Sequence, residues 1–172
     1  MNWGNDKALP ADLTGGSALD LGGYDGSNAR DLVARGASPV TLVDNREYLA
    51  YGWSAPEGYP DGVVYVEGDL MDYHDPADYV VCSNVIYHLT DPFACLAHLR
   101  RLTRRVLALT TSYRGAGDAR GWTFYPDGTG HPNGTVWCRP SIAGLVEAAH
   151  EAGFAEVEEV FRQGDQVTFR CA

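Results

Sequence analysis

The 172-residue sequence predicts an α/β fold, with a doubly wound, mostly parallel seven-stranded sheet that ends in a C-terminal antiparallel hairpin. Two observations predict it. Short apolar runs alternate with amphipathic stretches, which is the pattern of parallel strands joined by crossover helices. The last two apolar runs are joined only by Gln163-Gly164-Asp165, and a turn this tight makes an antiparallel hairpin. The length fits one domain over residues 1–172.

The first half of the chain supplies four strands and two helices after an N-terminal extension over 1–16. We expect the strands over 17–21, 39–43, 63–67 and 79–83, and the helices over 28–35 and 46–53. Gly36 ends the first helix. The prolines and glycines of 54–62 exclude regular structure there.

The second half begins with a helix over 91–103, for which Asp91 is the expected N-cap and Pro92 the first residue. A strand follows over 105–110. Residues 112–139 are rich in glycine, arginine and aromatic residues and show no clear period, so we interpret them as a functional loop. A helix from 140–141 to about 152 and strands over 156–161 and 166–171 complete the fold.

The composition restricts the function classes. Thirteen Lys and Arg against 23 Asp and Glu give a net charge of −10, which disfavours a partner held by its phosphates. The basic cluster over 100–105 lies at an expected helix end, where cations suit the helix dipole. No basic start precedes an apolar block and no apolar run could span a bilayer, so we expect a cytoplasmic protein without a membrane segment. The four separated cysteines predict isolated reduced thiols.

The strongest functional signal is a glycine loop over residues 22–26, directly after the first expected strand. Asp20, Gly22, Gly23 and Gly26 stand where a strand turns into a helix, and glycines there let backbone amides approach a ligand. Asp44, at the tip of the second strand, lies 18 residues beyond Gly26, where a carboxylate can accept both hydroxyl protons of a ribose. Together they predict an adenosine-containing cofactor.

The loop differs from a dinucleotide-binding loop. Tyr24 stands where a second spaced glycine is needed, and Asp25 would repel a pyrophosphate. S-adenosylmethionine carries an ammonium and a sulfonium group, which an acidic, aromatic loop suits. The antiparallel hairpin favours the same conclusion, because a dinucleotide fold would continue with parallel strands.

The sequence over residues 17–171 resembles the class I S-adenosylmethionine-dependent methyltransferases. The run Ala18-Leu19-Asp20-Leu21-Gly22-Gly23-Tyr24-Asp25-Gly26 resembles their first motif, and Val40-Thr41-Leu42-Val43-Asp44 their second-strand acidic motif. Glu67-Gly68-Asp69-Leu70 is similar to their adenine-contacting motif, and 79–92 to their fourth-strand segment. The nearest branch holds tRNA wobble-uridine modifying enzymes and small-molecule methyltransferases, and its members carry N-terminal lid helices that this sequence lacks.

The resemblance implies roles for these residues. Asp20 and Gly22 would shape the methionine end of the pocket, above a floor of Gly23, Tyr24 and Gly26. Asp44 would hold the ribose, with Asn45, Asp69 and Leu70 near the adenine. Ser83 and Asn84 would lie beside the transferable methyl. Two simpler interpretations stay open: Asp69 could cap a turn, and Asn84 could satisfy a strand end.

The sequence marks the residues that would bind the methyl acceptor less specifically than those that would bind the cofactor. His88 follows the fourth strand and is the best candidate for a general base, with Tyr87 as the alternative; a structural histidine before the 91–103 helix is an equal reading. In the 112–139 loop, Arg114, Arg120 and Arg139 could hold a carboxylate or phosphate, and His131 is a second possible base. Trp122, Tyr125 and Trp137 could stack on a flat ring or form a small satellite core. No spacing of His, Asp and Glu indicates a metal site.

Three hypotheses follow. The first is a methyltransferase for a small-molecule acceptor, methylated at oxygen or nitrogen. The second keeps the cofactor and makes a tRNA base the acceptor, and the third is a non-catalytic S-adenosylmethionine-binding module. About sixteen residues precede the first strand, so we expect residues 112–139 or the second subunit of a homodimer to close the site.

Overall fold

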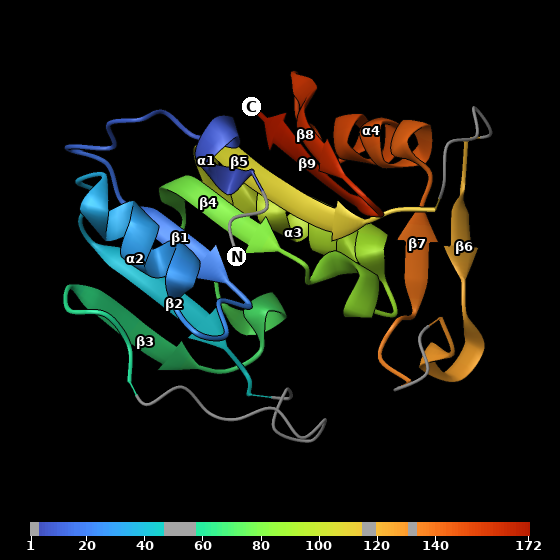
Figure 1. Ribbon diagram of the computed structural model, residues 1–172, viewed down its shortest axis with the longest axis horizontal. Helices are drawn as coiled ribbons and strands as arrows, with labels where there is room; N and C mark the ends of the chain where they lie inside the picture. Colours follow the sequence, from blue (N-terminus) through green and yellow to red (C-terminus); the bar gives the residue numbers. More distant parts are fainter. Residues whose placement is uncertain (1–3, 47–57, 115–119, 131–133) are drawn as a thin grey trace.

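The computed structural model describes residues 4–46, 58–114, 120–130 and 134–172, and within them it confirms the predicted fold class. A seven-stranded sheet has the strand order β3-β2-β1-β4-β5-β9-β8 (Figure 1). Its strands are β1 (Ala18–Leu21), β2 (Val40–Asp44), β3 (Val63–Glu67), β4 (Ala77–Ser83), β5 (Thr103–Ser112), β8 (Val157–Gln163) and β9 (Gln166–Cys171). The first five are parallel, and β9 runs antiparallel to both β5 and β8.

Helices cover both faces of this sheet (Figure 1). On one face lie α1 (Asn5–Ala8) and α2 (Ser27–Ala34), with a core that includes Leu32, Val40 and Leu42. On the other face lie α3 (Pro92–Leu102) and α4 (Ile142–Glu151). Three short 3₁₀ helices, η2 (Leu70–Asp72), η3 (Ile86–His88) and η4 (Pro126–Gly128), complete the described helical structure. Successive residues of β1 point to opposite faces, so Asp20 lies on the α2 side.

The predicted start of α3 is confirmed. Asp91 is the N-cap, its Oδ1 accepts a hydrogen bond from the Ala94 N–H at 2.9 Å, and Pro92 is the first helical residue. Asp91 supplies an acceptor that the first turn lacks, and proline has no N–H to leave unpaired there. Ser141 caps α4 in the same way, with its side chain accepting from the Gly144 N–H at 3.0 Å.

The interpretation of residues 112–139 as one loop is wrong. Ser112 belongs to β5, and β6 (Trp122–Phe124) pairs with β7 (Cys138–Pro140) in a separate antiparallel sheet. Each of these strands has three residues, too few for a visible alternation of apolar and polar side chains. Cys138 and Pro140 are buried where β7 passes close to η3.

The helix expected over 46–53 does not begin at its first residue. Arg46 has φ +58°, outside the right-handed helical region, and its N–H donates to the Asp44 carboxylate at 2.7 Å. Residues 47–57 lie outside the described part of the chain. The strand limits also differ: β4 begins at Ala77, and β5 follows α3 directly at Thr103.

All four cysteines are free thiols, as the sequence predicts, and all four are buried. Within the described residues, no group of three His, Cys, Asp or Glu side chains could hold a metal ion. The same part of the chain contains no helix with the length and apolar character needed to cross a bilayer.

Candidate cofactor and acceptor site

The predicted cofactor residues meet at the carboxyl edge of the sheet. Leu21, the last residue of β1, pairs with Val43 on one side and Cys82 on the other, so the segments after β1, β2 and β4 emerge side by side. In parallel α/β sheets this edge is where ligands bind. The order β2-β1-β4 therefore places the glycine loop between the segments that begin at Asp44 and Ser83.

The glycine loop lies tightly against its neighbours. Gly22 has φ +70° and donates its N–H to the Val43 carbonyl at 2.8 Å; a Cβ there would lie 2.4 Å from Val85 Cγ2. A Cβ on Gly23 would lie 2.6 Å from both Asp20 Oδ2 and Leu42 Cγ. Gly26 is the N-cap of α2 and has φ +70°. Glycine is therefore required by packing at 22 and 23, which lets this loop lie low over β1 and β2.

Asp20 lies completely buried beneath this loop. Its Oδ2 accepts from the Ala29 N–H at 3.1 Å, and its Oδ1 lies 3.5 Å from the Asn28 Nδ2 donor. Burial raises the pKa of Asp20 to about 7, against the lowering effect of the hydrogen bonds from Asn28 and Ala29. A carboxylate with no exposed surface shapes the loop from below.

Asp44 joins the loop to the tip of β2. Its Oδ2 accepts from the Tyr24 N–H at 2.9 Å, and its Oδ1 accepts from the Arg46 N–H at 2.7 Å. Each carboxylate oxygen can accept a second hydrogen bond, which is what two ribose hydroxyls require. Tyr24 has φ +41°, and Asn45 is exposed beside Asp44.

The predicted adenine-side residues form a capped turn. The exposed Asp69 is the N-cap of η2, and its Oδ1 accepts from the Met71 N–H at 2.8 Å. The carbonyl of the buried Leu70 accepts from Nε2 of His98 in α3 at 2.9 Å. Arg101 donates to His98 Nδ1 at 3.1 Å, and burial lowers the pKa of His98, so its ring is neutral. The turn-cap reading of Asp69 is thus observed, and its adenine contact stays a prediction.

Asn84 carries an unpaired acceptor at the end of β4. Its φ is +61°, and its N–H donates to the Thr110 carbonyl at 2.9 Å. Its side-chain Oδ1 is buried and has no hydrogen-bond partner among the described residues. Buried acceptors are almost always paired, so this oxygen is a candidate to accept a hydrogen bond from a bound ligand. Together with the unused lone pairs of Asp44, it fits a cofactor that offers hydroxyl and ammonium donors. Ser83, just before Asn84, is partly exposed.

Tyr87 and His88 lie together in η3. Their rings are 4.3 Å apart, and His88 Nδ1 contacts the carbonyl of Thr135. A carbonyl only accepts, so Nδ1 carries the proton and Nε2 is the basic nitrogen of the neutral ring. Burial raises the pKa of Tyr87 to about 12, so at neutral pH this phenol is a donor and not a base.

Strand β7 and the residue before it lie against η3 and bring predicted acceptor residues close to it. The Trp137 N–H donates to the Tyr87 carbonyl at 2.9 Å, and the half-buried Tyr125 donates its N–H to the Trp137 carbonyl at 2.8 Å. Arg139 follows in β7; its Nε is buried and has no hydrogen-bond partner within the described residues. Burial and the charge of Asp165 raise the pKa of Tyr87, and the charge of Arg139 offsets part of that rise.

Other predicted acceptor residues bond to protein groups elsewhere. Arg114 Nη1 donates to Thr123 Oγ1 at 2.7 Å, and Arg120 pairs with Glu147 at 3.4 Å. Trp122 donates its indole N–H to the Gly144 carbonyl at 3.3 Å, its ring centroid lies 5.1 Å from that of Phe93, and it packs against the main hydrophobic core rather than in a separate satellite core. His131 lies outside the described residues.

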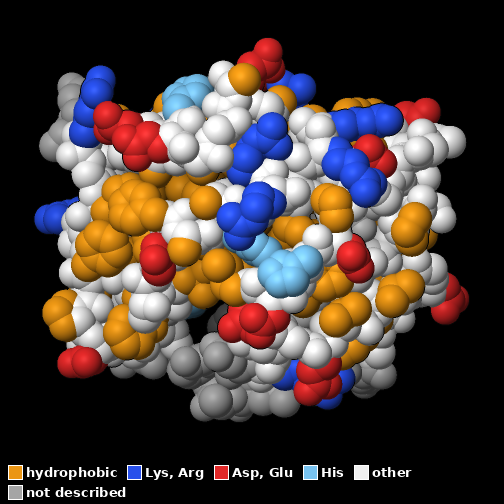
Figure 2. All heavy atoms as spheres, turned by 180° about the vertical axis from the view of Figure 1, so that it is seen from behind, with side chains coloured by type: hydrophobic (Ala, Val, Ile, Leu, Met, Phe, Trp, Pro, Cys, Tyr) orange, Lys and Arg blue, Asp and Glu red, His pale blue; other side chains and the backbone are white. Residues whose placement is uncertain are grey.

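The exposed surface beside β6 is aromatic. Phe93 and Phe124 are 45% and 50% exposed, and their rings are 6.5 Å apart. Figure 2 shows hydrophobic side chains gathered at the left of that face, the end of the molecule where Figure 1 places β6 and β7. The long segment thus divides into a part beside η3 and a part that packs elsewhere.

Sequence reasoning missed three residues that support the site: Asn5, Asn28 and His98. Asn28 bonds to Asp20 and to Asn5, and His98 holds the Leu70 carbonyl. His98 had a weak signal, because a histidine among the leucines of α3 needs a polar partner. Asn5 had none, since its partners lie far away in the sequence.

Comparison with known proteins agrees with this arrangement. A family model described as "Methyltransferase domain" matches residues 5–159. A tRNA U34 carboxymethyltransferase from Campylobacter lari is 33% identical over 94 residues, which cover 54% of this chain and 32% of that protein. The chain therefore matches about a third of the length of this curated relative.

Two solved structures show the same fold. An S-adenosylmethionine-dependent methyltransferase from Mesorhizobium loti matches with a TM-score of 0.68 and 20% identity, over 95% of this chain and 94% of that one. The Burkholderia thailandensis 1,6-didemethyltoxoflavin-N1-methyltransferase, solved with 1,6-didemethyltoxoflavin and S-adenosylhomocysteine, matches with a TM-score of 0.64 and 17% identity, over 92% and 71%.

The fold is that of solved S-adenosylmethionine-dependent methyltransferases, as the sequence resemblance implied. The chain belongs to the methyltransferase domain family, whose model covers residues 5–159.

Proposed function

We propose that this methyltransferase transfers the methyl group of S-adenosylmethionine to an oxygen or nitrogen of a small polar acceptor in the cytoplasm. The observation that carries the proposal is the Asp44 carboxylate. It stands at the carboxyl edge, is tied to the glycine loop through Tyr24, and keeps a lone pair on each oxygen. This arrangement suits a ribose diol beside a loop that closes over the rest of the cofactor.

Residues around the loop would hold the cofactor. Asp44 would accept from the ribose hydroxyls, and Asn84 Oδ1 would accept from a donor near the methionine end. Asp69 and Leu70 would lie at the adenine, next to the exposed Asn45. When bound, the cofactor supplies an electrophilic methyl on a sulfonium, which an acceptor attacks in line. The chain then contributes mainly by holding the acceptor in place and by excluding water.

His88 would take the acceptor proton. Its Nδ1 donates to the Thr135 carbonyl, so Nε2 is the basic nitrogen of the neutral ring. Tyr87, which stays protonated, would donate a hydrogen bond to the acceptor. Arg139, whose buried Nε has no partner among the described residues, would bind an acidic group on it. Together these three groups favour an acceptor that is both polar and anionic.

A tRNA base is the alternative acceptor. The Campylobacter lari relative is a tRNA enzyme by name, whereas the Burkholderia thailandensis structure holds a small molecule. We favour the small molecule because the chain carries a net charge of −10. Three arginines of the basic cluster also bond to protein groups: Arg100 to the Gly153 carbonyl, Arg101 to His98 and Arg105 to Asp78.

The test measures donor binding and methyl transfer in two variants. Asp44→Ala is expected to weaken S-adenosylhomocysteine binding by about tenfold or more, measured by calorimetry, because the ribose loses its charged acceptor. His88→Gln is expected to leave that affinity unchanged and to lower transfer by about a hundredfold. Transfer is followed with a radiolabelled methyl donor and a metabolite extract free of protein and nucleic acid.

Asp78→Ala is the matched control. Asp78 also accepts a backbone N–H, that of Ser17 at 3.0 Å, but it stands at the amino end of β4, away from the site. Its substitution should leave affinity and transfer unchanged. Unchanged affinity in Asp44→Ala would contradict the ribose assignment. A parallel assay offers purified tRNA in place of the extract. Label that enters tRNA and no small molecule would establish the alternative acceptor, and no transfer in either assay would favour a binding module.

A further inference from the structure

We propose that Asn5, in the N-terminal segment, is a positioning residue for the cofactor loop and acts through Asn28 on Asp20. The inference rests on the proposed function, because it takes the glycine loop over 22–26 as the donor site. It concerns a residue that no sequence motif marks and that lies outside the sheet edge described above.

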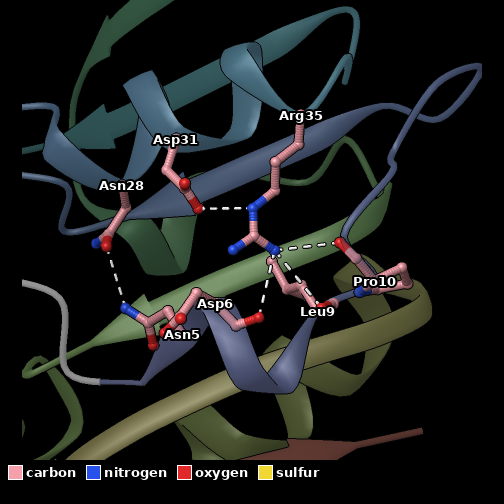
Figure 3. A network of polar contacts seen from close by, with 7 residues as sticks. All are labelled: Asn5, Asp6, Leu9, Pro10, Asn28, Asp31 and Arg35. Carbon is pink, nitrogen blue, oxygen red and sulfur yellow. Dashed lines mark hydrogen bonds and ion pairs between the residues drawn. The ribbon is translucent and has the colours of Figure 1, made fainter.

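The contacts form a continuous line from α1 to the loop. Asn5 is 5% exposed, and its Nδ2 donates to Asn28 Oδ1 at 3.0 Å (Figure 3). Asn28 is the second residue of α2, just after the Gly26 N-cap, and its own Nδ2 points to Asp20 Oδ1 at 3.5 Å. Asn28 thus stands between Asn5 and the carboxylate that underlies the loop.

The other end of the Asn5 amide is also occupied. Its Oδ1 accepts from Thr110 Oγ1 at 2.8 Å, and Thr110 Oγ1 lies 2.7 Å from Thr168 Oγ1. Because Thr110 gives its only hydroxyl proton to Asn5, Thr168 must donate to Thr110. Every hydrogen bond in this line therefore points the same way, and the line ends on the Asp20 carboxylate. Hydrogen bonds arranged in such a chain strengthen one another in a buried setting.

A second contact fixes α1 in this position. The Arg35 guanidinium, at the C-terminal end of α2, lies 3.1 Å from the Pro10 carbonyl and 3.5 Å from the carbonyls of Asp6 and Leu9 (Figure 3). Asp31 holds the same guanidinium at 2.9 Å. Helix α2 therefore binds the N-terminal segment at both ends, through Asn28 and through Arg35.

Loss of Asn5 would release Asn28 from its outer partner. Asp20 would then keep one firm hydrogen bond, from the Ala29 N–H at 3.1 Å. The Asp20 carboxylate lies directly under Gly23, so its movement would change the shape of the loop. We therefore expect the affinity for the donor to fall without loss of the fold.

The test compares S-adenosylhomocysteine binding by calorimetry in the wild-type chain, Asn5→Ala and Asn5→Asp. Asn5→Asp is nearly isosteric but cannot donate to Asn28. Both variants are expected to bind about tenfold more weakly, as expected for a lost buried hydrogen bond. Lys7→Ala is the control, because it changes an exposed residue of α1 outside the line. This control should bind like the wild type.

A double-mutant cycle separates positioning from simple stability. If Asn5 acts through Asn28, then Asn5→Ala should cost no further affinity once Asn28→Ala is present. Additive losses, or a lower melting temperature with unchanged affinity at a temperature where the variant is folded, would overturn the inference. Asn5→Ser, whose hydroxyl is too short to reach Asn28, serves if Asn5→Ala does not fold. If the wild type fails to bind, or Asp44→Ala binds normally, the proposed donor site itself is wrong.

Discussion

Asp20 is a buried carboxyl group, and its protonation state determines how this single residue affects the stability of the fold. Burial raises its pKa from 3.8 to about 7 in the folded chain. Between these two pH values the native state binds more protons than the unfolded state. The free energy of unfolding therefore falls as pH rises from about 4 to about 7, and the loss persists above pH 7. The shift corresponds to about 4 kcal/mol at most.

Asp20→Asn is expected to reverse this loss. The variant should unfold at a higher denaturant concentration than the wild type at pH 8, and should show no gain at pH 4, where Asp20 is protonated. Asp78→Asn is the control of opposite sign, because hydrogen bonds from Ser17 lower the pKa of Asp78. That variant should lose stability at pH 8. Equal pH profiles for the wild type and Asp20→Asn would contradict the assigned shift.

At the same scale, the sequence identifies site residues better than it identifies their contacts. Asp44 stands at the tip of β2, as predicted, and its contact with a ribose stays a prediction. Asp20 could be assigned to the glycine-loop motif but not to its buried position beneath the loop, because burial depends on α1 and α2 packing over β1. Asn5 could not be found at all, since its partner Thr110 lies 105 residues away.

Among the elements, the glycine loop gives the sharpest prediction. Gly22→Ala combines a positive φ with a Cβ placed 2.4 Å from Val85 Cγ2. We expect a loss of about 2–4 kcal/mol in the free energy of unfolding, from backbone strain and overpacking together. Chemical denaturation measures it.

Gly164→Ala is the matched control, because Gly164 also has a positive φ, +60°, but meets nothing within 4 Å. Gly164→Ala should lose only the part of the free energy of unfolding that comes from backbone strain. Adding Val85→Ala to Gly22→Ala should restore stability in part, since it removes the obstructing methyl groups. Equal losses at 22 and 164 would show that packing against Val85 is not the cause.

Elements with strong local signals are the ones that the sequence predicts well. The strands β1 to β5 follow apolar runs, and α3 begins at a proline after an aspartate cap. β6 and β7 could not be predicted, because three residues show no period and their pairing joins distant segments. The prediction that a helix starts at Arg46 was wrong for that residue, because the Arg46 N–H donates to the Asp44 carboxylate in a turn.

For the whole molecule, net charge governs which acceptors can approach. With a charge of −10 the chain should not bind bulk tRNA measurably at about 0.15 M salt, as followed by fluorescence anisotropy. Any binding at low salt should weaken steeply as salt is added. Tight binding at physiological salt that Arg104→Glu abolishes would instead support the tRNA alternative, because Arg104 is an exposed residue of the basic cluster.

The line of hydrogen bonds from Thr168 to Asp20 also orders events during synthesis. Asn5 is made before its partners Asn28 and Thr110, and Thr168, which orients Thr110, is made after all three. Such contacts between distant segments form late in folding. On the proposed role of Asn5, we expect the glycine loop to reach its final arrangement only once β9 has been made and docked, so a chain truncated before β9 should bind S-adenosylhomocysteine more weakly.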